Sequence, residues 1–193
     1  MVASLEEATG RYVNLMVQGR LYRIYFEEAG RGIPLLCLHT AGAEGSQYRH
    51  LLNDPDITRN YRVIAFDMPW HGKSLPPVGY HLEEYRLTTD LYVATIMAVC
   101  QELELEQPVI MCCSMGGRIV LQLAMAHAPE LRAVIGLESA DHQEPWYDTD
   151  WLHLPDIHGG EVSAALVSGL VAPQSPDEYR WETLWGYQQG GPG

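Results

Sequence analysis

The stretch MCCSMGGRIV, residues 111–120, places one serine between two cysteines and two glycines. The short apolar run VIMCC precedes the serine, and an apolar segment follows it as far as Ala128 and stops at Pro129. This order predicts a buried strand that turns sharply into a helix, because proline cannot continue a helix. Ser114 lies at the turn, either as a nucleophile or as a small residue that fits a crowded place.

Further short apolar runs lie on both sides of that turn. IPLLCLH (33–39), YRVIAFD (61–67) and LRAVIGLES (131–139) are almost wholly apolar, as is typical of strands in a parallel sheet covered on both faces. Upstream, two segments rich in aromatic and branched residues flank Gln18-Gly19, which predicts an antiparallel hairpin. The predicted fold class is therefore α/β, with a mostly parallel sheet and helices on both of its faces.

A helix is expected over residues 82–104, where apolar residues recur at spacings of four, three and four. These residues are Leu87, Leu91, Ala94 and Ala98. The composition changes after Ser139: residues 140–193 hold four of the five tryptophans and many prolines. Ser175-Pro176-Asp177-Glu178 predicts a capping box that starts a further helix. We expect a core over 1–139 and a helical cap or lid over 140–193.

Composition and charge exclude several classes of function. The net charge is −13 and there is no basic block, which disfavours binding to nucleic acid or to anionic lipid. No apolar run approaches the roughly 18 residues of a membrane-spanning helix. The N-terminal residues lack the pattern of a secretion signal, so we expect a cytoplasmic protein. The four cysteines include no C-x-x-C pair, and neither a metal nor another cofactor is expected.

Three loops are expected at the carboxyl ends of the parallel strands, where ligands bind in such sheets. The turn C-x-S-x-G-G resembles the nucleophile elbow G-x-S-x-G of the α/β-hydrolase superfamily, with Cys112 in place of the first glycine. LLCLHTAGAEGS is similar to the family's oxyanion loop, with Thr40 where glycine is usual. FDMPWHGKS resembles the segment D-x-P-G-H-G-x-S, with Trp70 in the glycine position. The resemblance covers residues 20–139 well and the cap loosely.

The resemblance implies a serine hydrolase that acts on a small-molecule acyl substrate. Ser114 would attack an ester, lactone, thioester or carbon–carbon bond next to a carbonyl, and form an acyl-enzyme. The backbone amides of Ala41 and Met115 would hold the oxyanion. Glu138 matches the place of the catalytic acid in some family members, although a structural role, as a strand-end carboxylate bonded to loop amides, fits the same position.

The histidine base of the family follows the last strand of an eight-stranded sheet, and this sequence has no such segment. His39 and His71 match loop-shaping residues, and the histidines of the expected cap are candidates for a substitute base. The chain therefore resembles the first two-thirds of such a hydrolase, without the family's C-terminal strands. The alternative is a catalytically silent fragment or subunit, for which a second chain or a missing C-terminal segment supplies the histidine.

The aromatic residues of the expected cap have two possible roles. Together with Thr40, the side chains of Trp146, Trp181 and Trp185 are candidates for substrate binding, because aromatic rings supply contact area and exclude water. Alternatively, the tryptophans anchor the cap to the sheet. The sequence does not separate these two roles.

Overall fold

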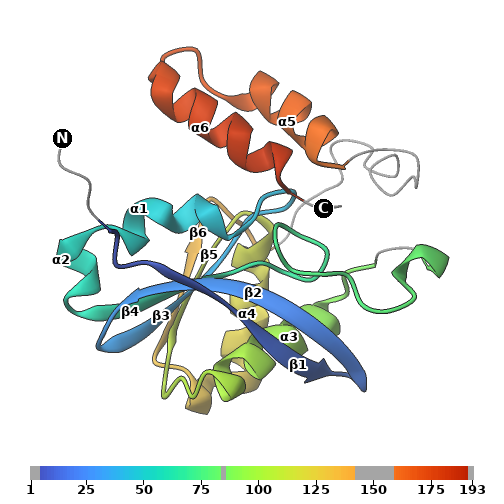
Figure 1. The fold of residues 1–193 in the computed structure, drawn as a ribbon. Helices are drawn as coiled ribbons and strands as arrows, with labels where there is room; N and C mark the ends of the chain where they lie inside the picture. The colour runs from blue at the N-terminus through green and yellow to red at the C-terminus, as the bar shows by residue number, and fades with distance from the viewer. Residues whose placement is uncertain (1–4, 84–85, 142–158, 191–193) are drawn as a thin grey trace.

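A computed structural model describes residues 5–83, 86–141 and 159–190, which form one six-stranded sheet flanked by helices (Figure 1). The strands are β1 (Thr9–Val17), β2 (Arg20–Gly30), β3 (Ile33–Leu38), β4 (Tyr61–Phe66), β5 (Val109–Cys113) and β6 (Ala133–Leu137). Their order in the sheet is β1-β2-β4-β3-β5-β6. The pairs β3–β4, β3–β5 and β5–β6 are parallel, and β1–β2 and β2–β4 are antiparallel. The α/β fold class with a mostly parallel sheet is confirmed.

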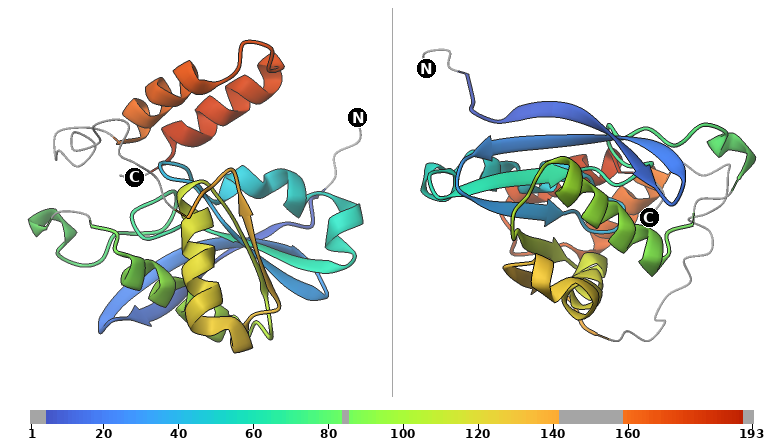
Figure 2. Two further views of the ribbon diagram at one scale, coloured as in Figure 1. Left: turned by 180° about the vertical axis from the view of Figure 1, so that it is seen from behind. Right: turned by 90° about the horizontal axis from the view of Figure 1, so that it is seen from below.

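Helices cover both faces of the sheet. The helices of the described residues are α1 (Arg49–Leu52), α2 (Pro55–Thr58), α3 (Thr89–Glu102), α4 (Met115–His127), α5 (Gly159–Leu170) and α6 (Asp177–Gln188), with short 3-10 helices η1 (Gly45–Tyr48), η2 (Tyr80–Leu82) and η3 (Ala128–Glu130), and α1 to α4 are the ones that lie on the sheet faces. Leu36 and Leu38 of β3 pack on the side of α3 and α4, and Leu35 and Cys37 pack on the opposite side with α1 (Figure 2). Successive side chains of a strand point to opposite faces, so a continuous apolar run fills two cores.

The hairpin between β1 and β2 forms at the predicted turn. Val17 pairs with Arg20, and Gln18 and Gly19 between them have φ angles of 50° and 78°. Two positive φ angles in a two-residue loop match the right-handed twist of the paired strands.

The helix after residue 82 differs from the expectation. It begins at Thr89, and the Thr88 side chain caps it by accepting a hydrogen bond of 3.2 Å from the Leu91 amide. The residues that α3 buries fully are not the predicted ones. Leu87, Leu91, Ala94 and Ala98 are half-buried and flank the buried face. The buried residues are Tyr92, Thr95, Ile96, Val99 and Cys100. The cause is the larger Tyr92, Ile96 and Val99 side chains, which bury more apolar area than the two alanines of the predicted stripe.

Helices α5 and α6 pack on each other beyond the carboxyl ends of β3 and β5 (Figure 1). The expected capping box is corrected here. The residue before the first turn of α6 is Pro176, whose side chain has no oxygen to accept a hydrogen bond from the helix. None of the helices in the described ranges is long and apolar enough to cross a membrane.

One edge of the sheet exposes apolar side chains. Strand β6 pairs with β5 on one side, and no other strand of the described residues pairs with its second side. Ile135 and Leu137 of β6 are 39% and 41% exposed, although the strand is apolar throughout. Such an edge favours pairing with a further strand.

Candidate active site

Ser114 lies between the last residue of β5 and the first residue of α4, in a backbone conformation that side chains rarely adopt. Its φ and ψ are 57° and −121°. Its amide donates a hydrogen bond of 2.9 Å to the Leu137 carbonyl, and its own carbonyl accepts one of 2.9 Å from Gly117. Backbone strain of this kind persists only where surrounding contacts enforce it, and it is concentrated at functional sites. The exposed serine hydroxyl is therefore held at a fixed place above the sheet.

Two glycines after Ser114 make the turn sterically possible. A Cβ on Gly116 would lie 1.5 Å from Sγ of Cys112, and a Cβ on Gly117 would lie 1.8 Å from Oγ of Ser139. Cys112 is fully buried, and its thiol donates to the Leu38 carbonyl over 3.1 Å. Burial raises the pKa of this thiol to about 12, so it stays protonated at neutral pH. Strand and helix thus approach closely although a cysteine replaces the first glycine of the motif.

The loop after β3 lies beside the nucleophile. The Thr40 amide donates a hydrogen bond of 2.9 Å to Oε1 of Gln47, and the Thr40 carbonyl accepts one of 3.2 Å from the Ala43 amide. Gly42 has a φ of 71°, and a Cβ there would lie 2.8 Å from Oγ of Ser163 in α5. Ala41, the predicted oxyanion donor, is half-buried in this loop. The second predicted donor, Met115, is the first residue of α4, where an amide has no acceptor within the helix.

Two buried histidines connect this loop to the loop after β4. Nδ1 of His39 lies 2.9 Å from the Thr40 carbonyl, and Nε2 of the same ring accepts a hydrogen bond of 3.0 Å from the Met68 amide. Nδ1 of His71 lies 3.0 Å from the Pro69 carbonyl. Burial lowers the pKa of His39 to about 3 and that of His71 to about 4, so both rings are neutral at pH 7. Both rings contact the backbone of their loops, which agrees with the loop-shaping role that the sequence predicts.

The loop after β4 is closed by a buried carboxylate. Oδ1 and Oδ2 of Asp67 accept hydrogen bonds of 2.7 Å from the amides of Gly45 and Lys73. Burial raises the pKa of Asp67 to about 6, against the opposing effect of these two amides. In the same loop, Trp70 takes the place of the family's glycine and has a φ of 73°. Its ring packs edge-on against Tyr80, with centroids 5.5 Å apart.

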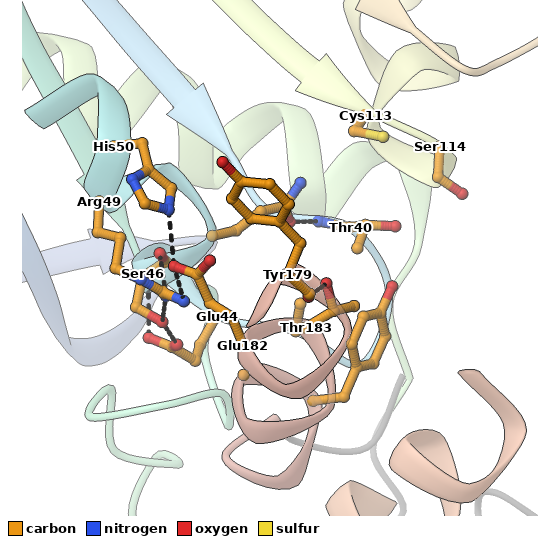
Figure 3. A pocket seen from close by; sticks show the side chains of 14 residues that line it. Thr40, Glu44, Ser46, Arg49, His50, Cys113, Ser114, Tyr179, Glu182 and Thr183 are labelled. Carbon is orange, nitrogen blue, oxygen red and sulfur yellow. Dashed lines mark hydrogen bonds and ion pairs between the residues drawn. The ribbon is translucent and has the colours of Figure 1, made fainter. Parts of the chain in front are cut away.

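A cavity of about 420 Å³ lies between Ser114, α1 and α6. Its lining comprises Thr40, Ala43, Glu44, Ser46, Gln47, Arg49, His50, Cys113, Ser114, Tyr179, Glu182, Thr183, Gly186 and Tyr187 (Figure 3). We call it the Ser114 cavity. The structure thus places Thr40 and Ser114, two of the predicted site residues, on the wall of one cavity.

Sequence reasoning missed the charged wall of this cavity. His50 and Arg49 of α1 both contact Glu182 of α6, and the distance from His50 Nε2 to Glu182 Oε1 is 2.7 Å. His50 and Ser114 lie on opposite sides of the cavity (Figure 3). His50 therefore pairs with a carboxylate and is not placed to take the proton of the serine. No local motif marks these three residues, because they come from two elements more than 120 residues apart.

Two of the predicted tryptophans, Trp181 and Trp185, do not reach Ser114. Trp181 and Trp185 are 68% and 53% exposed, and neither lines the Ser114 cavity. The face that α6 turns towards the cavity carries tyrosine, glutamate and threonine instead. Trp185 contacts Arg49, with the guanidinium carbon 5.5 Å from the ring centroid, which agrees better with the anchoring role than with substrate binding. Trp146 and the histidines at 142, 153 and 158 lie outside the described residues.

Glu138, the predicted acid, directly follows β6 and is exposed, with a φ of 48°. It lies near the nucleophile turn: burial raises the pKa of the Cys113 thiol, and the charge of Glu138 adds to that rise. The Ser114 cavity does not include it. Its position at a strand end next to the elbow is compatible with both the catalytic and the structural reading.

Comparison with known proteins agrees with this geometry. The model of the alpha/beta hydrolase fold family matches residues 33–157. The 2-hydroxymuconate semialdehyde hydrolase of a Pseudomonas strain is 30% identical over 119 residues, which are 61% of this chain and 40% of that protein. The magnesium-chelatase 30 kDa subunit of Rhodobacter capsulatus is 35% identical over 114 residues, which are 58% of this chain and 37% of that protein.

A solved structure shows the same fold over a longer range. A thermophilic esterase from Thermogutta terrifontis superimposes with a TM-score of 0.76 at 17% identity, over 93% of this chain and 65% of the esterase. The present chain thus spans about two fifths of the length of the curated relatives that it matches, at 40% and 37%.

Proposed function

Because this chain belongs to the α/β-hydrolase family, we propose that it carries the nucleophile of a serine hydrolase and that this nucleophile is Ser114. The observation that carries the proposal is the strained turn of Ser114 between β5 and α4, where Cys112 and Gly116 approach so closely that no Cβ fits on residue 116. A small residue that merely filled a turn would need neither a positive φ nor an exposed side chain.

The chemistry follows from this position. Oγ of Ser114 forms a bond to the carbonyl carbon of the substrate, and its proton passes to a base. The carbonyl oxygen becomes an oxyanion, held by the amide of Met115 at the start of α4 and by that of Ala41. The tetrahedral intermediate then expels the leaving group, which takes the proton from the base. Water then attacks the acyl carbon and gives its proton to the base, and the serine oxygen leaves with that proton, which releases the carboxylic acid and restores Ser114.

The base is proposed to come from a further polypeptide segment, either covalently continuous with this chain or a second chain. His39 and His71 are buried and bonded to the backbone, and His50 is paired with Glu182. The exposed edge of β6, with Ile135 and Leu137, is a surface on which such a segment can add a strand. Glu138, at the end of that strand, is our candidate for the carboxylate that orients the histidine.

The substrate class is proposed from the relatives. One of them is named as a hydrolase of 2-hydroxymuconate semialdehyde, and a protein of the same fold is an esterase. Cleavage of an ester, lactone, thioester or a carbon–carbon bond next to a carbonyl proceeds through the same attack on a carbonyl. We place the reaction in the cytoplasm, because all four cysteines are free thiols.

The proposal is tested with a p-nitrophenyl butyrate assay of the protein purified together with any chain that binds it. Ser114→Ala is expected to abolish hydrolysis, and Ser168→Ala, which removes an exposed hydroxyl of α5, is expected to leave it unchanged. Hydrolysis by Ser114→Ala at the rate of the unmodified protein would refute the assignment.

The silent-subunit alternative is tested at the sheet edge. If a second chain pairs with β6, Ile135→Lys should release it on a sizing column, because a lysine on an edge strand opposes pairing. Met16→Lys places the same charge on β1 at the opposite edge, on a residue 64% exposed, and should retain the partner. A stable monomer without a bound chain would count against this alternative.

A further inference from the structure

Two basic side chains of α1 meet one carboxylate of α6 inside the Ser114 cavity. Nη2 of Arg49 and Nε2 of His50 both contact Oε1 of Glu182. Arg49 is held from two other directions, by the Ser46 carbonyl at 2.8 Å from Nη1 and by the ring of Trp185. Its guanidinium is thus fixed on the wall of the cavity, and its charge is neutralised by Glu182.

The charge balance of the wall follows from the four acidic or basic side chains among the described residues that line it. These are Glu44, Arg49, His50 and Glu182. The Glu44 carboxylate bonds to Ser46: its Oε2 accepts a hydrogen bond of 3.0 Å from the Ser46 amide, and its Oε1 contacts the Ser46 hydroxyl. Glu44, Glu182 and Arg49 bring two carboxylates and one guanidinium to the wall, so the single guanidinium is outnumbered by carboxylates. The other lining groups are uncharged, with hydroxyls from threonine and tyrosine and an amide from Gln47.

We propose that Glu182 is a specificity-determining residue: by neutralising Arg49, it confines the Ser114 cavity to uncharged acyl groups. This inference rests on the proposed function and adds the substrate class to it. An acyl chain with a distal carboxylate meets two carboxylates and a cation that is already paired, so its desolvation is not compensated. An uncharged acyl chain meets neither penalty and can bond to the hydroxyls of the wall. Glu182 does not touch the reacting atoms.

The matched variants are Glu182→Gln and Glu178→Gln. Glutamine keeps an oxygen that can accept from Arg49 and His50, so α6 can keep its contact with α1 while the charge is removed. Glu178 lies one turn earlier on α6, is exposed, and is not part of the cavity lining, so its variant removes the same charge elsewhere. The two substrates are p-nitrophenyl hexanoate and mono-p-nitrophenyl adipate, which share the acyl length and differ by one carboxylate.

The measured quantity is the ratio of kcat/KM for the adipate ester to that for the hexanoate ester. The unmodified protein should prefer hexanoate, and Glu182→Gln should shift the ratio about tenfold towards adipate. This factor corresponds to removal of a unit charge at about 6 Å in a medium of effective dielectric constant about 40. Glu178→Gln should leave the ratio unchanged. A preference for adipate in the unmodified protein, an unchanged ratio in Glu182→Gln, or an equal shift in Glu178→Gln would overturn the inference.

A double variant and a binding measurement make the result independent of turnover. Arg49→Gln combined with Glu182→Gln removes both charges and should restore the preference for hexanoate. Calorimetric titration with free adipate should show binding to Glu182→Gln and at least about fivefold weaker binding to the unmodified protein. If neither ester is hydrolysed by any variant, the proposed function fails, whereas adipate binding still decides the inference. Equal adipate affinity in both proteins contradicts it.

Discussion

The sharpest structural prediction concerns the contact that replaces the first glycine of the elbow motif. In Gly116→Ala, the new Cβ would lie 1.5 Å from Sγ of Cys112, less than half the separation of two atoms in contact. The thiol is fully buried and donates to the Leu38 carbonyl, so it cannot turn away without losing a hydrogen bond. Overpacking of this kind costs about 3 kcal/mol. For a chain of this size, that corresponds to a decrease of about 6 to 12 °C in Tm.

The assay is urea unfolding followed by tryptophan fluorescence, with Gly169→Ala as control. Gly169 lies in α5 and has nothing within 4 Å of the added Cβ, so that variant should be neutral or slightly more stable. In Cys112→Ala, the remaining Cβ lies 2.9 Å from the place that a Cβ on residue 116 would take, so the double variant Cys112→Ala/Gly116→Ala should recover about 2 kcal/mol of the loss. Additive effects of the two substitutions, or a fully stable Gly116→Ala, would refute the reasoning.

Two further predictions concern buried charges. Below pH 6.5 the unfolded chain binds protons on His39 and His71 that the folded chain, with pKa values of about 3 and about 4, does not bind. Stability should therefore fall by about 2 kcal/mol for each histidine between pH 7 and pH 5, offset by about 1 kcal/mol from Asp67, whose raised pKa of about 6 favours the folded state as the pH falls. Urea midpoints at the two pH values measure the net loss, and equal midpoints would contradict it. Glu28→Ala should cost about 2 kcal/mol, because the carboxylate contacts both Arg11 and Arg62, the latter at 2.8 Å. An unchanged urea midpoint at pH 7 would contradict this prediction.

The strands and the elbow could be predicted from the sequence because their determinants are local. Each parallel strand is a short apolar run that fills two cores. The small residues around Ser114 reflect the close approach of Cys112, two positions before the serine, to Gly116, two positions after it. The buried face of α3 was less predictable. Both Leu87–Ala98 and Tyr92–Cys100 present apolar residues at helical spacing, and only the packing against β1 and α4 selects between them.

The wall of the cavity could not be predicted, because it depends on contacts between distant segments. Nothing near His50 or Glu182 in the sequence indicates that they meet, and the orientation of α6 decides which of its faces reaches Ser114. Tryptophans were the obvious candidates for a substrate wall, yet the helix turns Tyr179 and Thr183 inwards and leaves Trp181 exposed. Ion pairs across elements carry no periodic signal, so the sequence does not reveal them.

The central claim is that Ser114 is an activated nucleophile, and reaction with a fluorophosphonate tests it most directly. The native preparation is treated with the reagent, and the intact mass of every chain present is recorded. We predict one adduct on this chain that is absent in Ser114→Ala and retained in Cys113→Ser, which excludes the neighbouring thiol. An adduct that persists in Ser114→Ala, or no adduct on this chain in the presence of every co-purifying chain, would contradict the claim.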